Sequence, residues 1–366
     1  MPRPLTDVRA GRPDALDVAF VVPRSGNAGI FGPSCEACGV LAAEEINASG
    51  GLLGRELRLR KVDGGRPPAD VAAAVDRLIT AGDVEAVAGW HISAVRQALA
   101  PVVSDRVPYV YSPLYEGGER TPGVFLAGET PDRQVLPAMR WMSREIGVRT
   151  WFVVGDDYVW PHATTRAVRR FARASPDLRI MDEMFVPLGT RNYGPAVQRV
   201  IRSGAQGVLM FLVGSDAVQF NRAFARASLD SSRVRLSPLM EENMLLASGA
   251  ENTRELYASA GFFETLATSA GLDFSRRYAE RFGTRAPVLN SLGESCYEGL
   301  TLLTKLAGRA GSMGLAELCG AADALVYESP RGLVRMAGNH LLQSVYLARA
   351  DGVQFDVIAE LTRLPR

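Results

Sequence analysis

Short apolar segments alternate with amphipathic segments along the chain from residue 16 onward. Residues 16–23, 55–63 and 84–89 have the length and residue types of strands, whereas residues 35–48 and 68–82 carry apolar side chains at helical spacing. This alternation predicts parallel sheets built from right-handed βαβ units.

The same pattern restarts after Phe125. A helix is predicted at 132–146, a strand at 150–157 and a helix at 162–174, and further pairs follow. The sequence therefore predicts an α/β fold with two doubly wound parallel-sheet lobes. The remainder consists of two long helical segments and then a β-rich tail, with strands expected at 333–337, 344–350 and 353–361.

Composition narrows the class of protein. The chain has 366 residues, 47% of them hydrophobic, which is enough for more than one core. Its 41 Lys and Arg balance 40 Asp and Glu without a basic run, so no direct nucleic-acid partner is expected. The longest apolar runs, such as 207–214, are far shorter than the roughly 20 residues of a membrane-spanning helix.

Residues 1–15 are expected to form an N-terminal extension. They contain three arginines but no apolar stretch behind them, so they do not read as a secretory signal. Four cysteines in a chain of this size do not indicate a disulfide scaffold and are compatible with a reducing compartment. The missing signal and the few cysteines together predict a cytoplasmic protein. A chain trimmed of its signal would look similar, which leaves an extracytoplasmic location as the alternative.

Four loops are expected at the carboxyl ends of strands, where open parallel sheets bind ligands. They are residues 24–32, 90–93, 111–116 and 156–161. Ser93 directly precedes a helical segment, where its hydroxyl would cap the helix or face a ligand. The aromatic residues of these loops suit a small cavity with hydrogen-bonding tips, although core packing is the commoner role of a single ring; they are Tyr111, Tyr158 and Trp160.

Catalysis is poorly supported by the sequence. The three histidines, His91, His162 and His340, show no ligand spacing, and no metalloprotease, nucleophile-elbow or P-loop motif occurs. No catalytic residue, metal or cofactor is therefore expected. Cys35 and Cys38 form a CxxC pair near a helix start, which leaves a redox protein as a less favoured alternative.

Several longer motifs resemble one family. They are GVLAAEEINASGGLLGREL, VYSPLYEG, VVGDDYVWP, FLVGSDAVQF, LGESCYEGLTLL and SPRGLVRMAGNH. With these motifs nearly the whole chain from Leu16 resembles type I periplasmic-binding proteins, in particular their amide and urea branch and the AmiC-type cytoplasmic amide sensors of amidase operons.

The resemblance implies two lobes joined by three crossovers near Gly128, Gly261 and Pro330, with a ligand in the cleft between them. Lobe one would comprise residues 16–127 and 262–328, and lobe two residues 128–261 and 329–366.

The resemblance also implies roles for single residues. Ser93 matches a serine that hydrogen-bonds the ligand, and Tyr111 and Tyr158 match pocket tyrosines. His91 and Trp160 stand where the amide sensors have tyrosines, which puts acetamide specificity in doubt. Glu241 and Glu242 could offer a carboxylate to a ligand N–H, or could simply be solvated. The full set of expected ligand-binding residues is Ser93, His91, Tyr111, Ser112, Tyr158, Trp160, Ser215, Glu241 and Glu242.

The working hypothesis is recognition without chemistry, in which a short amide, urea or similar molecule stabilises closure of the lobes. As a cytoplasmic sensor of this kind, the protein would act on a regulatory protein that controls amidase or nitrile-metabolism genes. The alternative is the substrate-binding component of an ABC importer for amides, urea or branched-chain amino acids, with a permease as partner. A homodimer is left open.

Overall fold

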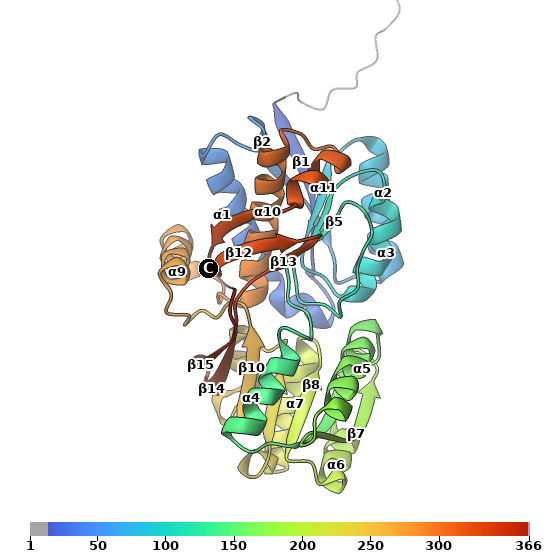
Figure 1. Cartoon of the computed structure of the whole chain (residues 1–366), viewed down its shortest axis with the longest axis vertical. Helices are drawn as coiled ribbons and strands as arrows, with labels where there is room; N and C mark the ends of the chain where they lie inside the picture. Colours follow the sequence, from blue (N-terminus) through green and yellow to red (C-terminus); the bar gives the residue numbers. More distant parts are fainter. Residues whose placement is uncertain (1–13, 365–366) are drawn as a thin grey trace, which may run out of the picture.

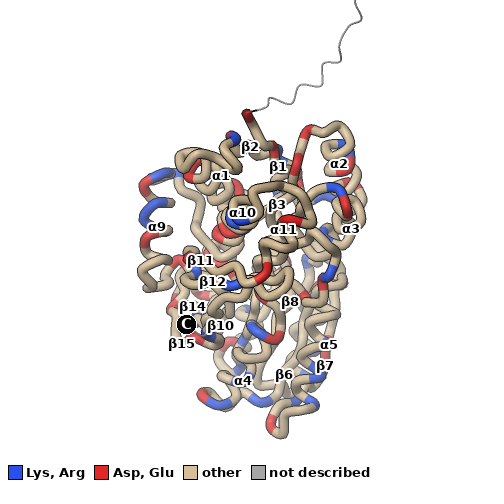
Figure 2. Tube along the Cα trace, turned by 45° about the horizontal axis from the view of Figure 1, so that its top comes forward, with Lys and Arg blue, Asp and Glu red and all other residues tan. Residues whose placement is uncertain are grey.

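The computed structural model describes residues 14–364 as two α/β lobes stacked along the long axis of the molecule (Figure 1). The extension expected at 1–15 thus lies almost wholly outside the described residues. Acidic and basic residues are interspersed over both lobes (Figure 2). Within the part of the chain that the structure describes, no helix is both long and apolar enough to cross a membrane.

Lobe one is built on an eight-stranded sheet with the strand order β11-β12-β13-β5-β4-β3-β1-β2. Its strands are β1 (Ala15–Val22), β2 (Glu56–Asp63), β3 (Ala86–Gly89), β4 (Tyr109–Tyr111), β5 (Val124–Leu126), β11 (Val326–Ser329), β12 (Gly332–Ala337) and β13 (His340–Leu342). Its helices are α1 (Gly32–Ala48), α2 (Pro68–Ala81), α3 (Ser93–Val103), α9 (Ser269–Phe282), α10 (Ser291–Ala310) and α11 (Leu315–Ala322).

Lobe two is built on a seven-stranded sheet with the order β15-β14-β10-β9-β8-β6-β7. Its strands are β6 (Thr150–Asp156), β7 (Arg179–Val186), β8 (Gly207–Phe211), β9 (Val234–Ser237), β10 (Leu256–Ala260), β14 (Val345–Asp351) and β15 (Gln354–Thr362). Its helices are α4 (Val135–Glu145), α5 (Val159–Ala174), α6 (Gly194–Ser203), α7 (Ser215–Arg226) and α8 (Glu242–Ser248). The predicted fold class is confirmed.

The central strand of lobe one shows why both faces of its sheet are covered. Val18 and Phe20 of β1 pack in the core that holds α1 and α10, whereas Ala19 and Val21 pack with α2 and α3. Successive side chains of a strand point to opposite faces, so a continuous apolar run needs a helix layer on each side. Figure 1 shows these two helix pairs on either side of β1.

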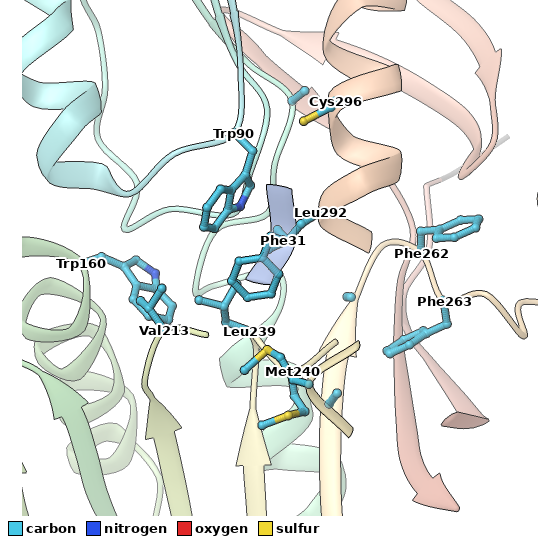
Figure 3. Close-up of a cluster of buried hydrophobic side chains, with 14 of the residues drawn as sticks. Phe31, Trp90, Trp160, Val213, Leu239, Met240, Phe262, Phe263, Leu292 and Cys296 are labelled. Carbon is cyan, nitrogen blue, oxygen red and sulfur yellow. The ribbon is translucent and has the colours of Figure 1, made fainter. Parts of the chain in front are cut away.

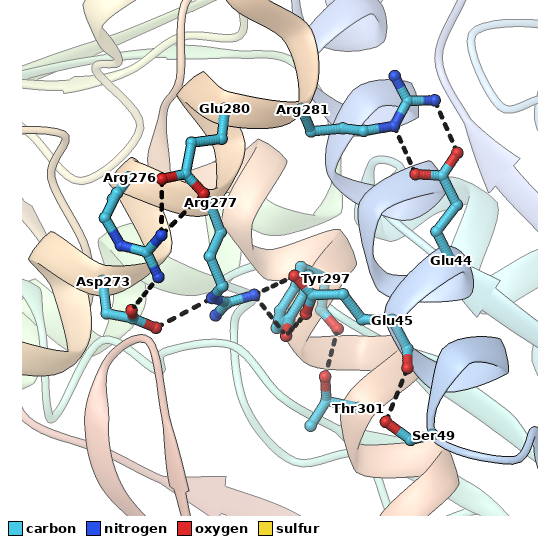
Figure 4. A network of polar contacts seen from close by, with 10 residues as sticks. All are labelled: Glu44, Glu45, Ser49, Asp273, Arg276, Arg277, Glu280, Arg281, Tyr297 and Thr301. Atoms are coloured by element: carbon cyan, nitrogen blue, oxygen red, sulfur yellow. Dashed lines mark hydrogen bonds and ion pairs between the residues drawn. The ribbon is translucent and has the colours of Figure 1, made fainter.

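Polar contacts hold α9 against the rest of lobe one. Arg281 of α9 forms a two-bond pair with Glu44 of α1, at 2.6 and 2.7 Å. The Tyr297 hydroxyl of α10 donates to Glu45 at 2.6 Å, and Arg277 donates to the same hydroxyl at 3.3 Å (Figure 4). These contacts join α1, α9 and α10 into one layer.

The third crossover differs from the expectation. The chain passes between lobes after β5, after β10 and, finally, between β13 and β14. The expected crossover near Pro330 is wrong, because β11, β12 and β13 extend the sheet of lobe one, and His340 of β13 pairs with Leu126 of β5. Residues 329–342 therefore belong to lobe one, and β14 and β15 alone complete lobe two.

A buried polar network connects the three crossovers. Glu129 of the first crossover accepts the backbone N–H of Gly261 in the second at 2.6 Å. Arg331 donates to Gln343 of the third crossover at 2.6 Å and to Glu294 of α10 at 2.5 Å. Each of these side chains is at least 95% buried. The connections between the lobes thus share one set of hydrogen bonds.

Candidate functional site

The lobes are closed on each other along a seam of direct contacts. Asn27, in the short helix η1 (Asn27–Phe31) of lobe one, donates to Asp216 of lobe two at 2.6 Å. On the same side, Asn243 of lobe two donates to the backbone oxygen of Ile30 at 2.8 Å. A third contact joins α10 of lobe one to lobe two, where the backbone N–H of Leu292 donates to Glu241 at 3.3 Å.

A cavity of about 10 Å³ lies between the lobes, at the carboxyl ends of the strands. This is about the space of one water molecule and far below the roughly 300–1,000 Å³ of drug-sized ligand pockets, so an organic ligand requires the two lobes to move apart from this closed arrangement. Both lobes contribute to its wall, which is mainly aromatic and aliphatic. The lining residues are Trp90, His91, Ile92, Ser93, Tyr111, Pro113, Leu114, Tyr158, Trp160 and Leu239.

Both ring nitrogens of His91 are engaged inside lobe one. Nδ1 lies 3.1 Å from the backbone oxygen of Val21, and Nε2 lies 2.5 Å from the hydroxyl of Tyr109. Burial lowers the pKa of His91 to about 4, so the imidazole is neutral at physiological pH. His91 therefore contributes an uncharged wall with no free nitrogen.

The hydroxyls of Ser93 and Tyr111 also donate to protein groups. Ser93 is the first residue of α3 and Ile92 is the N-cap, so the expected capping role of Ser93 is wrong. Its hydroxyl donates to Glu116 at 2.6 Å, and the Tyr111 hydroxyl donates to the backbone oxygen of His91 at 2.8 Å. Each hydroxyl keeps its oxygen lone pairs as acceptors, and both residues line the cavity.

Sequence reasoning missed the residues that hold Ser93. Arg96, one turn along α3, donates to Glu116 at 2.7 Å and also pairs with Glu119. The Arg96 guanidinium lies over the rings of Tyr111 and Tyr115, 5.6 and 5.1 Å from their centroids. The signal was present in the YEG segment, where an acid follows the aromatic residues of a strand-end loop.

The lobe-two wall is formed by the start of α5 and the loop after β9. Trp160 packs edge-on against Phe211 with centroids 5.8 Å apart, and Tyr158 lies 6.3 Å from Trp160. Figure 3 shows Trp90 of lobe one just above Phe31, with Trp160 of lobe two to their left and Leu239 below Phe31. Burial raises the pKa of the half-buried Tyr158 well above its usual value, so its hydroxyl stays protonated and can donate.

Two helices begin at this cavity, one from each lobe. Within the described residues, the backbone N–H groups of Ser93 and Ala94 in α3 have no protein acceptor, and the same holds for Val159 and Trp160 in α5. Free N–H groups and the helix dipole make such ends favourable for anions. Both walls therefore present main-chain donors beside the aromatic rings.

Five of the predicted ligand-binding residues share the cavity and four lie outside it. Ser112 faces α10, with its hydroxyl 3.3 Å from that of Ser295, and Ser215 is exposed at the start of α7. Glu241 and Glu242 are neither solvated nor in the cavity, because α8 turns them into the seam and the interior. The five that line it, Ser93, His91, Tyr111, Tyr158 and Trp160, remain predictions as ligand contacts.

The CxxC pair lies in the core of lobe one. Cys35 and Cys38 are fully buried, and the Cys35 thiol donates to the backbone oxygen of Leu292 at 3.5 Å. Burial raises the pKa of both thiols well above the usual value, with nearby Cys296 adding to it. Reactive cysteines need the opposite shift, so the structure disfavours the redox alternative.

Glu242 is a buried carboxyl with an unusual proton affinity. It accepts the backbone N–H of Glu264 at 2.9 Å, and burial raises its pKa to about 8. The folded state therefore holds this proton more tightly than the unfolded chain, whose Glu pKa is about 4.3. The contribution of Glu242 to the free energy of unfolding is therefore present at acid pH. It is lost as the pH rises towards 8, by up to about 1.4 kcal/mol per pH unit.

We expect Glu242→Gln to flatten this dependence, because glutamine keeps the acceptor and has no proton to lose. Urea unfolding at pH 6 and pH 9 measures the difference. Glu280→Gln, at an exposed position of α9, is the control and should keep the wild-type slope. Equal slopes for Glu242→Gln and the wild type would show that Glu242 is ionised in the folded state.

Comparison with known proteins identifies the family. The model of the periplasmic binding protein family matches residues 15–354. The chain belongs to this family. A Leu/Ile/Val-binding protein homolog of Brucella melitensis is 26% identical over 297 residues, which cover 78% of this chain and 75% of the relative.

Solved structures of periplasmic binding proteins share the fold over most of the chain. A solute-binding protein of an ABC transporter from Rhodopseudomonas palustris HaA2, in complex with p-hydroxybenzoic acid, has a TM-score of 0.85 at 20% identity and covers 95% of this chain and 96% of its own. The branched-chain amino acid binding protein LivJ of Streptococcus pneumoniae, in complex with isoleucine, has a TM-score of 0.81 at 16% identity and covers 94% and 99%. These likenesses show a shared fold, while closeness to amide sensors is not shown.

Proposed function

We propose that this periplasmic binding protein is the solute-binding component of an ABC importer and that its ligand is a small aromatic carboxylate. The observation that carries the proposal is the chemistry of the two facing walls, because each lobe presents aromatic side chains and a helix N-terminus to the narrow cavity between them. A ligand that touches both lobes favours the closed state by its difference in affinity between the two states.

The walls support an aromatic ring with an anionic group. Trp90, Tyr111, Tyr158 and Trp160 offer ring faces and edges for stacking. The unpaired N–H groups at the starts of α3 and α5 favour a carboxylate without a cationic side chain. Structural neighbours from Rhodopseudomonas palustris were solved with p-hydroxybenzoic acid, 3,4-dihydroxybenzoic acid and benzoate, which supports the same ligand class.

The cavity gives less support to amino acids and short amides. No acidic side chain is among its lining residues, so an α-ammonium group would lose its water without a direct counter-charge. Glu241 and Glu242, expected to serve such a group, are engaged elsewhere. A short amide has neither a ring to stack on the aromatic walls nor a negative charge for the free N–H groups.

Thermal-shift measurements test the ligand class. We expect benzoate and para-hydroxybenzoate at 100 times their Kd to stabilise the fold by about 2.7 kcal/mol, with no comparable effect of acetamide, urea or leucine. Tyr158→Ala should remove the effect. Tyr346→Ala replaces a half-buried tyrosine of β14 away from the cavity and serves as the matched control. A shift with leucine or acetamide alone would overturn the proposed ligand class.

An importer role also requires a location outside the cytoplasmic membrane and a permease partner, whereas the cytoplasmic location expected above belongs with a regulatory partner. Cell fractionation of the native protein distinguishes the two. Recovery from the cytoplasm would contradict the importer role, and co-purification with a permease would support it.

A further inference from the structure

The hydroxyls at the lobe-one edge of the cavity act as hydrogen-bond acceptors, beside the free N–H groups of Ser93 and Ala94, where an anion-binding edge would add hydroxyl donors. A serine or tyrosine hydroxyl has one proton to donate. Ser93 donates its proton to Glu116 at 2.6 Å, and Tyr111 donates its proton to the backbone oxygen of His91 at 2.8 Å. What these hydroxyls offer to the cavity is therefore oxygen lone pairs.

The charged side chains behind Ser93 also disfavour a ligand carboxylate at this edge. Arg96 is bound by two carboxylates, those of Glu116 and Glu119, which leaves the group with one negative charge in excess. Glu116 lies directly behind the Ser93 hydroxyl. A ligand carboxylate at Ser93 would meet oxygen lone pairs and, 2.6 Å beyond them, a second carboxylate.

The opposite edge also has free backbone N–H groups, and its hydroxyl, that of Tyr158, donates to no residue that the structure describes. Tyr158 is protonated, and the backbone N–H groups of Val159 and Trp160 are free at the start of α5. In the groove outside the cavity, Arg166 and Arg170 of α5 face Glu116 and Glu119 across the seam.

The acidic groups of lobe two near this edge are engaged. Asp157 pairs with His162 at 2.7 Å, and Asp156 accepts the backbone N–H of Val213 at 2.7 Å. Burial beside Asp216 raises the pKa of Asp156 well above its usual range, which reduces its negative charge.

We propose that the ligand binds with a hydrogen-bond donor, a hydroxyl or amino group, at Ser93 and Tyr111, and with its carboxylate at Tyr158 and the start of α5. Glu116 is the positioning residue, because it takes the Ser93 proton and thereby makes Ser93 an acceptor. The inference rests on the proposed function and adds to it a required donor group and an orientation in the cavity.

Three aromatic acids probe the donor requirement by isothermal titration calorimetry. Para-hydroxybenzoate carries a donor, para-methoxybenzoate carries only an acceptor, and benzoate carries neither. We expect the wild type to bind para-hydroxybenzoate at least about tenfold more tightly than the other two, because a buried acceptor without a donor is left unpaired.

Glu116→Gln tests the positioning role. A glutamine amide can donate to the Ser93 oxygen and release the serine proton towards the ligand, so the preference over para-methoxybenzoate should fall to about twofold or less. Glu119→Gln is the matched control, because it also removes a partner of Arg96 but does not touch Ser93. It should keep the wild-type ratio. Ser93→Ala removes the acceptor itself and should lower the preference even if Glu116→Gln does not fold.

Tyr158→Phe tests the orientation. Loss of a donor to the carboxylate should weaken all three acids by a similar factor and leave their ratio unchanged.

Equal affinity of the wild type for the three acids would overturn the inference while leaving the proposed function intact. A change of ratio in Tyr158→Phe or Glu119→Gln equal to that in Glu116→Gln would overturn the assignment of Glu116. If none of the acids binds to the wild type, the proposed function is wrong and the inference falls with it.

Discussion

Replacing Arg331 with methionine is expected to lower the free energy of unfolding by about 3–5 kcal/mol, because it leaves buried carboxylates without their counter-charge. Arg331 is 1% exposed and donates to Glu294 at 2.5 Å, and it lies 3.7 Å from Glu129. Burial already raises the pKa of Glu294 to about 8, with Arg331 opposing the rise. Without the guanidinium, Glu294 will hold its proton to still higher pH.

The loss should therefore grow as the pH rises past about 8, because the folded wild type then releases the Glu294 proton whereas the folded variant still holds it. Urea unfolding at pH 6 and pH 9 measures both the loss and its direction. Arg349→Met removes a half-exposed pair with Glu255 and, as the control, should cost less than about 1 kcal/mol. A double variant with Glu294→Gln should recover part of the stability. A loss as small as that of the control would show that the network at the crossovers does not stabilise the fold.

Gly214→Ala is expected to weaken binding of para-hydroxybenzoate at least about tenfold by preventing full closure. Gly214 follows β8 in lobe two, and an added Cβ would lie 2.1 Å from the backbone oxygen of Asn27 in lobe one. The Asn27–Asp216 hydrogen bond of 2.6 Å crosses the seam beside this backbone contact. Calorimetric titration gives the affinity, and small-angle scattering of the free protein should show a larger radius of gyration than the wild type.

Alanine at Gly214 also meets an unfavourable backbone, with a φ of 53°. Gly204→Ala separates the two effects, because Gly204 has a φ of 66° in the same lobe but no atom within 4 Å of an added Cβ. This control should lose some stability and bind the ligand as the wild type does. Equal weakening of binding in both variants would show that strain in lobe two, and not the seam, limits affinity.

The sequence predicted the sheet lobes and the cavity loops because both depend on local patterns. Apolar strands alternate with amphipathic helices, and parallel strands place their carboxyl ends at one edge. His91, Ser93, Tyr111, Tyr158 and Trp160 were found by that rule, and the structure brings them to one cavity.

The remaining features depend on contacts between distant segments. The third crossover was misplaced because nothing local in 333–342 shows that β13 pairs with β5. A Glu in a loop reads as solvated, so the burial of Glu241 against the start of α10 was not predictable, and the YEG segment marked Glu116 without showing that it binds Ser93. Arg96 was missed for the same reason, since an arginine on a helix usually reaches water.

The late return of the chain to lobe one has a consequence for the order of folding. Lobe one contains the first described strand, β1, but its sheet is completed only by β11, β12 and β13, and α1 packs against α10. During synthesis, the edge of β5 has no neighbouring strand and the apolar face of α1 stays exposed to solvent. Both are covered only after residues 291–342 have left the ribosome. Lobe one therefore cannot fold completely before most of lobe two has been synthesised. Both lobes reach their final structure at nearly the same time. We expect nascent chains that stop before α10 to aggregate or to need a chaperone, although they already contain every residue that lines the cavity.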